Sequence, residues 1–472
     1  MSEPSLQSFL EFSTSDLGDV RRNRRAAKVV EQLAAHSGRS VAQSCGSLSE
    51  ATACYRLAGN PDVSHDGLLQ GHRERTAGRS RGRPVVLCAQ DTTTFSFGQR
   101  APIEGLGPID SALAVQGFFA HSALMIDPED GSVLGVAAQE VWARSWTAAP
   151  KGETSAERKL RTRESEHWGR VQVDVAAAFG RRRLADASWP APRPDDPRII
   201  AVFDREGDIF EAMETMQELG HGFVIRAIRD RKLETPISEA SLSTRAVESA
   251  PELGTVVFEV PRKPGQASRT ATLSVRGLTM SLMPPKSRGR KGASLHVGMV
   301  LIQEIAAPEG VAPLCWYLLT TEPCETLAEA LRVVRYYRFR WNVEEFHMGL
   351  KTGCSVERAQ FDTMHSFENF VAISTVAAWR MLVLRDAARS GEPSLPLEIL
   401  TNVQRSILRR EFPKLGASPT ARDWMRALAK LGGFFGRKSD GEPGWRTLWW
   451  GWRRLCDLEA GWLMAIGRCV DR

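Results

Sequence analysis

Apolar residues at helical spacing predict a small helical domain at the N-terminus. Val29, Val30 and Leu33 follow Asp19, a residue type that caps helices, and the pattern stops near Gly38. We therefore expect residues 1–70 to form a helical domain. The next stretch is rich in Gly and Arg between 77 and 84, which favours irregular backbone, so residues 71–84 are predicted to be a basic linker.

Short continuous apolar runs replace the helical pattern after this stretch. Residues 85–89 and 199–203 each resemble a buried strand, and each run leads to an aspartate, Asp91 in the first case and Asp204 in the second. Further strands are expected at 117–126 and 132–142, and a helix at 164–179. Both aspartates are therefore predicted at exposed ends of buried strands.

Residues 222–321 are dominated by β-branched runs, and helical patterns return after them. The runs at 255–260, 270–275 and 295–305 are separated by turns such as 284–292, which predicts a β-rich insertion. Long helices are expected at 327–349 and 367–388, and the chain beyond about 395 is also predicted to be helical. This last region concentrates tryptophans: Trp424, Trp445, Trp449, Trp450, Trp452 and Trp462.

Length and composition limit the architecture without deciding the function. A chain of 472 residues with 42% hydrophobic and 25% charged residues is long enough for several domains with sizeable cores. The net charge of +6 is too small to indicate a nucleic-acid partner by itself. Basic residues are nevertheless locally dense in two groups: Arg21, Arg22, Arg24, Arg25 and Lys28, then Arg73, Arg75, Arg79, Arg81 and Arg83.

The first basic group lies at the start of a predicted helix, where cations oppose the helix dipole. Contact with DNA phosphates and a merely solvated face are equally good explanations. The eight cysteines include no C-x-x-C pair and no zinc-type Cys/His spacing, so free thiols are expected. With no signal pattern and no apolar run of about eighteen residues, the protein is expected to be soluble and cytoplasmic.

The predicted helix 327–349 carries a stripe of polar residues, and one common role would explain this stripe and the two aspartates. Tyr337, Arg340, Glu344 and Lys351 fall on one face at about 100° per residue. Cleavage of a phosphodiester needs an activated water and a stabilised leaving oxygen, and two divalent ions about 4 Å apart supply both when carboxylates hold them. Singly, a strand-end aspartate is usually a turn residue, and such a helix face is usually a solvated ladder of ion pairs. Their conjunction indicates a metal-dependent phosphoryl-transfer site.

The spacing of these four residues resembles the signature of bacterial DDE transposases of the Tyr-Arg-Glu-Lys subgroup. The resemblance extends to the surroundings of Asp91 and Asp204, and it spans nearly the whole chain. Its further matches are Leu17-Gly18-Asp19, Tyr55-Arg56, Asn60-Pro61 and Leu431-Gly432-Gly433-Phe434.

What the resemblance implies is an α/β fold with an RNase H-like catalytic core, a mixed sheet flanked by helices. The catalytic domain would cover residues 85–390 with the insertion at 222–321, followed by a helical dimerisation domain at 391–472. Asp91, Asp204 and Glu344 would be the catalytic residues and would hold two Mg²⁺ ions per site, with Mn²⁺ also accepted. The partners implied are transposon-end DNA, target DNA and a second copy of the chain.

The resemblance also implies which side chains contact DNA. Tyr337, Arg340 and Lys351 would bind phosphates near the cleaved end, and Arg21, Arg22, Arg24 and Arg25 would serve the N-terminal end-binding domain. Trp316 would stack a flipped base, although a core tryptophan fits the sequence equally well. Arg226, with Arg229 and Arg231, would contact DNA from the insertion. Glu345 lies about 100° around the helix from Glu344, which favours Glu344 alone as the metal ligand.

Several alternatives stay open at this point. A metal-dependent nuclease without strand transfer would use the same core, and a catalytically silent DNA-binding regulator would be favoured only by loss of one of the three acids. The C-terminal tryptophans fit a dimer interface, and they fit a packed helical core slightly better. DNA contacts of the basic loops at 262–269 and 286–291 are not assigned. A transposase would act in the bacterial cytoplasm in association with the nucleoid.

Overall fold

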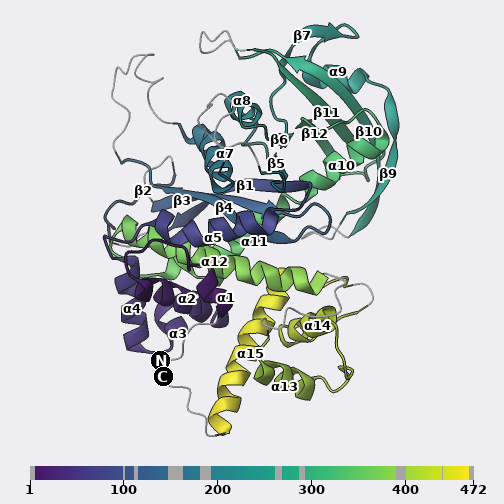
Figure 1. Ribbon diagram of the computed structural model, residues 1–472. Helices are drawn as coiled ribbons and strands as arrows, with labels where there is room; N and C mark the ends of the chain where they lie inside the picture. The colour runs from purple at the N-terminus through teal and green to yellow at the C-terminus, as the bar shows by residue number, and fades with distance from the viewer. Residues whose placement is uncertain are drawn as a thin grey trace.

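The computed structural model describes residues 6–98, 101–110, 115–146, 163–180, 193–260, 268–285, 293–389, 400–437 and 440–466. Within these ranges the chain forms a large mixed sheet with helices, so the expected α/β class is confirmed. The purple N-terminal helices and the yellow C-terminal helix α15 (Trp445–Ala465) lie beneath the green helix α12 (Met364–Arg389) in Figure 1. Both ends of the chain therefore pack on the same side of the molecule.

Short helices build the N-terminal region, as predicted. They are α1 (Leu6–Leu10), α2 (Val20–Ala35), α3 (Val41–Cys45), α4 (Leu48–Ala58) and α5 (His65–Ser80). Asp19 caps α2, since its side chain accepts a hydrogen bond of 2.8 Å from the backbone N–H of Arg21. The sequence therefore located this helix correctly from its cap.

The predicted linker over 71–84 is wrong for most of its length, because α5 continues through it to Ser80. In a sequence, glycines in such a stretch suggest that a helix ends there. In the structure, Gly71 instead lies where α5 crosses the segment around Glu11. A Cβ atom at Gly71 would come within 2.6 Å of the Glu11 carbonyl oxygen. The glycine therefore permits close packing of two segments instead of ending a helix.

The central part of the sheet combines antiparallel and parallel strands. Strand β3 (Gln116–Ile126) runs antiparallel to both β1 (Val85–Ser96) and β4 (Val133–Trp142). On the other side of β1, strands β5 (Arg198–Phe203) and β6 (Gly222–Arg226) follow in parallel. A short strand β2 (Gly107–Pro108) pairs with β3. The predicted strands at 117–126, 132–142 and 199–203 are thus confirmed.

The β-rich region continues this sheet, which has 12 strands in the part of the chain that the structure describes. Strand β6 lies within the expected insertion, yet it pairs with β5 of the central sheet and with β12 of the insertion. The remaining strands are β7 (Lys232–Ile237), β8 (Ala240–Leu242), β9 (Glu252–Val260), β10 (Arg269–Leu282), β11 (Leu295–Glu304) and β12 (Cys315–Thr320). The insertion is therefore joined to the core edge to edge.

Helices cover both faces of the central sheet (Figure 1). Val86 and Cys88 of β1 pack in one apolar cluster with α7 (His167–Ala178), whereas Leu87 and Ala89 belong to the cluster that contains α12. Side chains of a strand alternate between faces, so Asp91 shares the face of Leu87 and Ala89. The other helices are α8 (Phe210–Glu218), α9 (Ser243–Ser249), α13 (Asn402–Glu411) and α14 (Ala421–Leu431), with a 3-10 turn at Glu164–Glu166.

The long helix predicted at 327–349 is divided into two. Helix α10 (Leu327–Arg338) ends where the backbone N–H groups of Phe339 and Arg340 bond three residues back, to Tyr336 and Tyr337. Helix α11 (Trp341–Met348) then begins and leads into a π-helical turn, Gly349–Gly353, and a 3-10 turn, Val356–Arg358. The expected single face for Tyr337, Arg340, Glu344 and Lys351 is therefore wrong.

Helix α12 is central to the packing of the described residues. Its window Met364–Ala387 is long and apolar enough to cross a membrane, with a mean hydropathy of 1.3, but 82% of that window is buried inside the protein. It packs against α2, α5 and α14. The apolar composition of this helix is thus explained by its position in the core, as is common for the central helix of a globular fold.

Candidate active site

Asp91 and Asp204 come to the same level of the sheet on neighbouring strands. Strands β1 and β5 are parallel, and Ala89 pairs with Val202 in their register. Asp91 and Asp204 each lie two residues further along, and neighbouring strands are about 4.8 Å apart. Asp91 is inside β1, which runs on to Ser96, so it does not follow the strand end as predicted, whereas Asp204 directly follows β5.

The break between α10 and α11 brings Arg340 and Glu344 to these aspartates. Arg340 precedes α11, and its guanidinium lies 3.4 Å from the Asp91 carboxylate and forms an ion pair with Glu344. Arg340 thus contacts acids from both the sheet and the helix. The structure therefore brings Asp91, Asp204, Arg340 and Glu344 into one site.

The electrostatics of this site are dominated by crowded negative charge. Burial raises the pKa of Asp91 to about 7, and the charge of Asp204 adds to the increase, with a smaller contribution from Glu344. The guanidinium of Arg340 and a hydrogen bond of 2.8 Å from the Thr92 N–H act in the opposite direction. The charge of Arg340 therefore does not offset burial and the neighbouring acids.

Among the described residues, no group of three or more His, Cys, Asp and Glu side chains is close enough to hold a metal ion. Arg340 contacts Asp91 and Glu344 in this arrangement. The donor set itself consists of carboxylate oxygens, the ligands that hard divalent ions prefer. A cation between these acids would relieve the charge crowding that raises the pKa of Asp91.

A half-buried aromatic pocket of about 520 Å³ adjoins the acids. Trp316 of β12 and Tyr337 of α10 contact edge to face in it, with ring centroids 5.4 Å apart. The Arg226 guanidinium lies 6.0 Å from the Trp316 centroid, and Arg340 also lines the pocket. Trp316 is therefore neither fully buried in the core nor fully exposed. The pocket combines apolar side chains with arginines.

Lys351 reaches the same face of the sheet from the π-helical turn. Its ammonium group lies 5.9 Å from the ring centroid of Phe95, which has the same strand parity as Asp91 in β1. The four residues of the sequence signature thus come from three successive segments. They converge around β1 although they do not share one helix face.

Two family models match the two ends of the chain. A transposase DNA-binding model matches residues 9–63, and a Tn5 transposase dimerisation-domain model matches residues 376–466. Both matched segments are therefore similar to domains of Tn5-like bacterial transposases. The first match covers α2, α3 and α4, and the second covers the end of α12 and all of α13, α14 and α15.

A solved structure of another transposase shows a weak likeness to this chain. The cryo-EM structure of a piggyBac transposase synaptic complex with hairpin DNA is 11% identical, with a TM-score of 0.30. The match covers 64% of this chain and 48% of the other. The chain therefore spans about half the length of that transposase.

Most of the N-terminal basic residues already have acidic partners inside the DNA-binding domain. Arg25 and Lys28 both pair with Glu50, and Arg22 pairs with Asp62. Arg21 pairs with Asp19 but keeps 84% of its side chain exposed. Arg24 is exposed, and no contact of its side chain is recorded among the described residues. Arg21 and Arg24 are thus the accessible members of the group.

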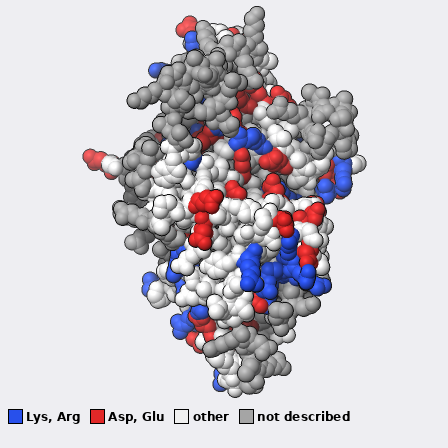
Figure 2. Space-filling model, turned by 90° about the vertical axis from the view of Figure 1, so that its left-hand side faces the viewer, with Lys and Arg blue, Asp and Glu red and all other residues white. Residues whose placement is uncertain are grey.

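The arginines of the second basic group also form ion pairs within the protein. Every member pairs with a carboxylate: Arg73 with Asp66, Arg75 and Arg79 with Glu11, Arg81 with Asp196 and Arg83 with Asp127. On the face drawn in Figure 2, a compact blue patch of Lys and Arg has red acidic side chains next to it. Local density of basic residues in the sequence therefore overstates the free positive charge.

The C-terminal tryptophans divide between core and surface. Trp424, Trp445 and Trp449 are buried, whereas Trp450 is 50% exposed on α15. Trp452 donates a hydrogen bond of 2.7 Å to the Ala34 carbonyl of the DNA-binding domain. The interpretation of these residues as a packed helical core fits the three buried tryptophans, whereas half of Trp450 is exposed to solvent.

Arg231 does not have the exposed position expected for a DNA contact. Only 9% of its side chain is exposed, and it pairs with Asp208 at 2.5 Å. Arg229 on the same loop is exposed, and Arg226 lines the aromatic pocket. The expected DNA contact therefore does not fit Arg231, because the buried Asp208 in the loop after β5 pairs with it, whereas the contacts of Arg226 and Arg229 stay predictions.

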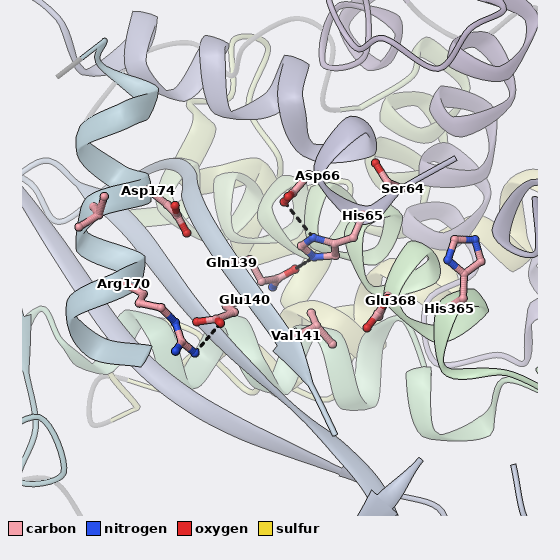
Figure 3. Close-up of a pocket in the computed structure, with 11 residues that line it drawn as sticks. Ser64, His65, Asp66, Gln139, Glu140, Val141, Arg170, Asp174, His365 and Glu368 are labelled. Carbon is pink, nitrogen blue, oxygen red and sulfur yellow. Dashed lines mark hydrogen bonds and ion pairs between the residues drawn. The ribbon is translucent and has the colours of Figure 1, made fainter. Parts of the chain in front are cut away.

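A second cavity of about 680 Å³ lies at the outer edge of the sheet between α5, β4, α7 and α12. Figure 3 shows His65 hydrogen-bonded to Gln139 at 3.0 Å and Arg170 paired with Glu140 at 2.7 Å. Asp91, Asp204 and Glu344 are not among its lining residues. It is therefore separate from the acidic site.

Three supporting residues were not indicated by the sequence. His121 of β3 is fully buried and contacts Thr92 at 2.8 Å and Gln90 at 3.0 Å, the two neighbours of Asp91. Asp208 and Arg385 are buried as well, and each is charged and paired. No spacing signal distinguishes such residues, because their partners are distant in sequence. The loops at 262–267 and 286–291 lie outside the described residues.

Proposed function

We propose that the protein is a cut-and-paste DNA transposase that nicks transposon ends, forms and reopens hairpins, and joins the ends to target DNA. The observation that carries this proposal is the convergence of Asp91, Asp204 and Glu344 with Arg340 between a DNA-binding and a dimerisation domain. The mixed sheet flanked by helices is compatible with an RNase H-like core. The protein would act in the bacterial cytoplasm, at the nucleoid.

Asp91, Asp204 and Glu344 would hold two Mg²⁺ ions, with Mn²⁺ accepted as a substitute. When bound, the ions supply an activated water or 3′ hydroxyl and neutralise charge on the reacting phosphate. Their binding requires Asp91 in its charged form. Because burial and Asp204 raise the pKa of Asp91 to about 7, this carboxyl is only partly charged near neutral pH until a cation is present.

The cationic side chains around the acids would bind the DNA backbone. Arg340 offers a planar fork for phosphate oxygens and Lys351 a flexible point charge. Arg340 pairs with Asp91 and Glu344 in the protein alone, so it would exchange these carboxylates for phosphates when DNA and metal bind. Arg340 would thereby offset part of the negative charge of the acids until metal and DNA bind.

Trp316 and Tyr337 would provide the surface on which an unstacked base rests during hairpin formation. Their pocket of about 520 Å³ adjoins Arg340 and is rimmed by Arg226 and Arg338. A base has a polarizable face that stacks on an indole ring, and the cations would hold its phosphates. The same pocket would exclude water from the stacked base.

A joining assay tests this proposal. Purified protein is incubated with a donor carrying the element's own terminal DNA, supercoiled target plasmid and Mg²⁺, beside the variant Asp204→Asn. The proposal predicts joined products with the wild type and none with the variant. Cut but unjoined products would indicate a nuclease. Specific binding of end DNA without cleavage would indicate a regulator.

Two further controls separate a loss of DNA cleavage and joining from a loss of dimer assembly. Glu309 is exposed and does not line the aromatic pocket, so Glu309→Gln removes one acid outside the cluster. It is expected to join DNA as the wild type does. Assembly of two chains on paired ends is measured by native gels, and Asp204→Asn is expected to assemble normally.

A further inference from the structure

The loop after β6 is fixed to the loop that carries Asp204 by one buried carboxylate. Asp208 is 1% exposed, and its Oδ2 accepts hydrogen bonds of 2.8 Å from the backbone N–H groups of Ile228 and Arg229. Ile228 itself is 64% exposed. A solvent-facing loop tip is thus held from beneath by a side chain that water does not reach.

Arg231 completes the connection from the other side of the loop. Its guanidinium lies 2.5 Å from Asp208 Oδ1 and also donates to the Asp208 carbonyl at 3.1 Å. Its backbone N–H donates to Ser243 Oγ at 3.0 Å, which ties the loop to the start of α9. Side chain and backbone of Asp208 are therefore both engaged by residues 228–231.

The segment from Asp204 to Asp208 is compact enough to transmit this constraint. The Asp204 carboxylate accepts a hydrogen bond of 2.8 Å from the Glu206 N–H. The Asp208 N–H bonds to the Arg205 carbonyl at 3.3 Å. Gly207 packs so closely on Phe203 that a Cβ there would come within 2.6 Å of the ring-bearing carbon. Displacement of Asp208 would therefore move Asp204 as well.

The loop held in this way flanks the acidic site. Arg226 at its start lines the aromatic pocket together with Tyr337 and Arg340, and Arg340 contacts Asp91. Arg229 is exposed at the tip. The cationic start and tip of the loop thus have a defined position relative to Asp204.

We propose that Asp208 and Arg231 are positioning residues, which lock the loop 226–230 to the Asp204 loop so that bound DNA is aligned with the metal-holding acids. This inference rests on the proposed function. Arg226 and Arg229 would grip the backbone of the end DNA, and the ion pair would set the distance from that grip to Asp204. Misplacement of a reacting group by about 1 Å costs on the order of 100-fold in rate, so the lock acts on the chemical step.

The chain offers a matched control for this ion pair. Asp196 precedes β5 as Asp208 follows it, its side chain is 1% exposed, and it pairs with Arg81 at 3.1 Å. It also accepts a hydrogen bond of 2.9 Å from the Arg193 N–H. Asp196→Asn therefore disturbs an equivalent ion pair at the opposite end of the same strand, away from the acids.

The test compares Asp208→Asn, Arg231→Gln, Arg231→Lys and Asp196→Asn in the full-length protein. Amide exchange reports on residues 228 and 229, and single-turnover nicking is measured at saturating end DNA with Mg²⁺. Asp208→Asn and Arg231→Gln are expected to speed exchange at both amides and slow nicking by about tenfold or more. Affinity for end DNA should change little, and Arg231→Lys should recover part of the rate.

Two results would overturn the inference. One is an unchanged nicking rate per folded molecule in Asp208→Asn and Arg231→Gln, with only thermal stability reduced. The other is an equal loss of rate in Asp196→Asn, which would make the effect a general one of stability. The exchange measurement needs no activity: unchanged exchange contradicts the lock itself, whereas a wild type that binds but does not nick contradicts the proposed function.

Discussion

Glu345 points away from the acidic site and forms an ion pair with Arg385 of α12, whose side chain is 0% exposed. Arg385 also pairs with Asp386, and Asp386 accepts a hydrogen bond of 2.8 Å from the Val133 N–H. Adjacent acids on α11 thus have separate roles, since Glu344 faces Arg340 and Glu345 anchors the helix to α12 and β4.

Removal of the Glu345 charge should destabilise the fold without removing a metal ligand. Glu345→Gln leaves Asp386 as the ion-pair partner of a fully buried guanidinium, so a loss of about 1–3 kcal/mol in unfolding free energy is expected. Urea denaturation measures it, with Glu309→Gln as the exposed control. A variant as stable as the wild type would show that Asp386 alone satisfies Arg385.

The network around Glu11 should make the fold sensitive to acid. Burial alone would raise the pKa of Glu11, but the hydrogen bond from His72 and the charge of Arg79 outweigh it and hold the pKa at about 2. A depressed pKa stabilises the fold above the ordinary value of 4.5 and loses that contribution as pH falls towards 2. The contribution at neutral pH is about 3 kcal/mol.

Glu11→Gln removes this contribution and is therefore the direct test. It should be less stable than the wild type at pH 7, and the difference should shrink as pH falls from about 4.5 to 2. Denaturation midpoints across this range measure both effects. A difference that does not vary with pH would show that hydrogen-bond geometry, and not charge, stabilises the contact.

The close crossing at Gly71 predicts a large effect for a small substitution. Gly71→Ala places a Cβ within 2.6 Å of the Glu11 carbonyl oxygen, so the crossing must open and a loss of about 1–3 kcal/mol is expected. Gly78→Ala is the matched control, since a Cβ there meets nothing within 4 Å, and it should stabilise α5 slightly. Thermal unfolding compares them. Equal behaviour of the two variants would restore the linker interpretation of this segment.

The N-terminal arginines should differ in their effect on DNA binding. Arg24 is exposed and free of recorded contacts among the described residues, whereas Arg25 is held by Glu50. Arg24→Ala should weaken end binding and reduce the salt dependence by about one ion. Arg25→Ala should chiefly lower the stability of the domain. Binding titrations at several salt concentrations separate these outcomes, and an unchanged salt slope in Arg24→Ala would remove it from the interface.

Local signals account for what the sequence predicted correctly. The cap at Asp19 and the apolar runs of β3, β4 and β5 depend on neighbouring residues, so their positions were close to those observed. The structure brings Asp91, Asp204 and Glu344 together although the predicted helix is broken, and their role as metal ligands stays a prediction. That break itself depends on packing: a Cβ on Gly131 would come within 2.4 Å of the Phe339 ring, a contact between residues far apart in the chain.

Long-range partners account for what the sequence missed. Asp208 and Arg231 are separated by a helix and a strand, and Arg385 meets Glu345 across two packed helices. Likewise, β6 pairs with both β5 and β12 and so joins the insertion to the core. The apolar pattern of one strand does not reveal which other strands it pairs with. Such contacts arise from the folded arrangement, and a charged residue in a sequence resembles a solvated one until its partner is known.

The most direct test of the central claim is the single-turnover rate of end nicking with Mg²⁺ in Asp91→Asn, Asp204→Asn and Glu344→Gln, beside Glu309→Gln. Each of the three substitutions keeps the shape of the side chain and removes one charge from the proposed metal site. If these acids act as one unit, each variant should lose on the order of 1,000-fold in rate while still binding end DNA, and the control should match the wild type. A folded variant of any of the three that nicks within about tenfold of the wild-type rate would contradict the account.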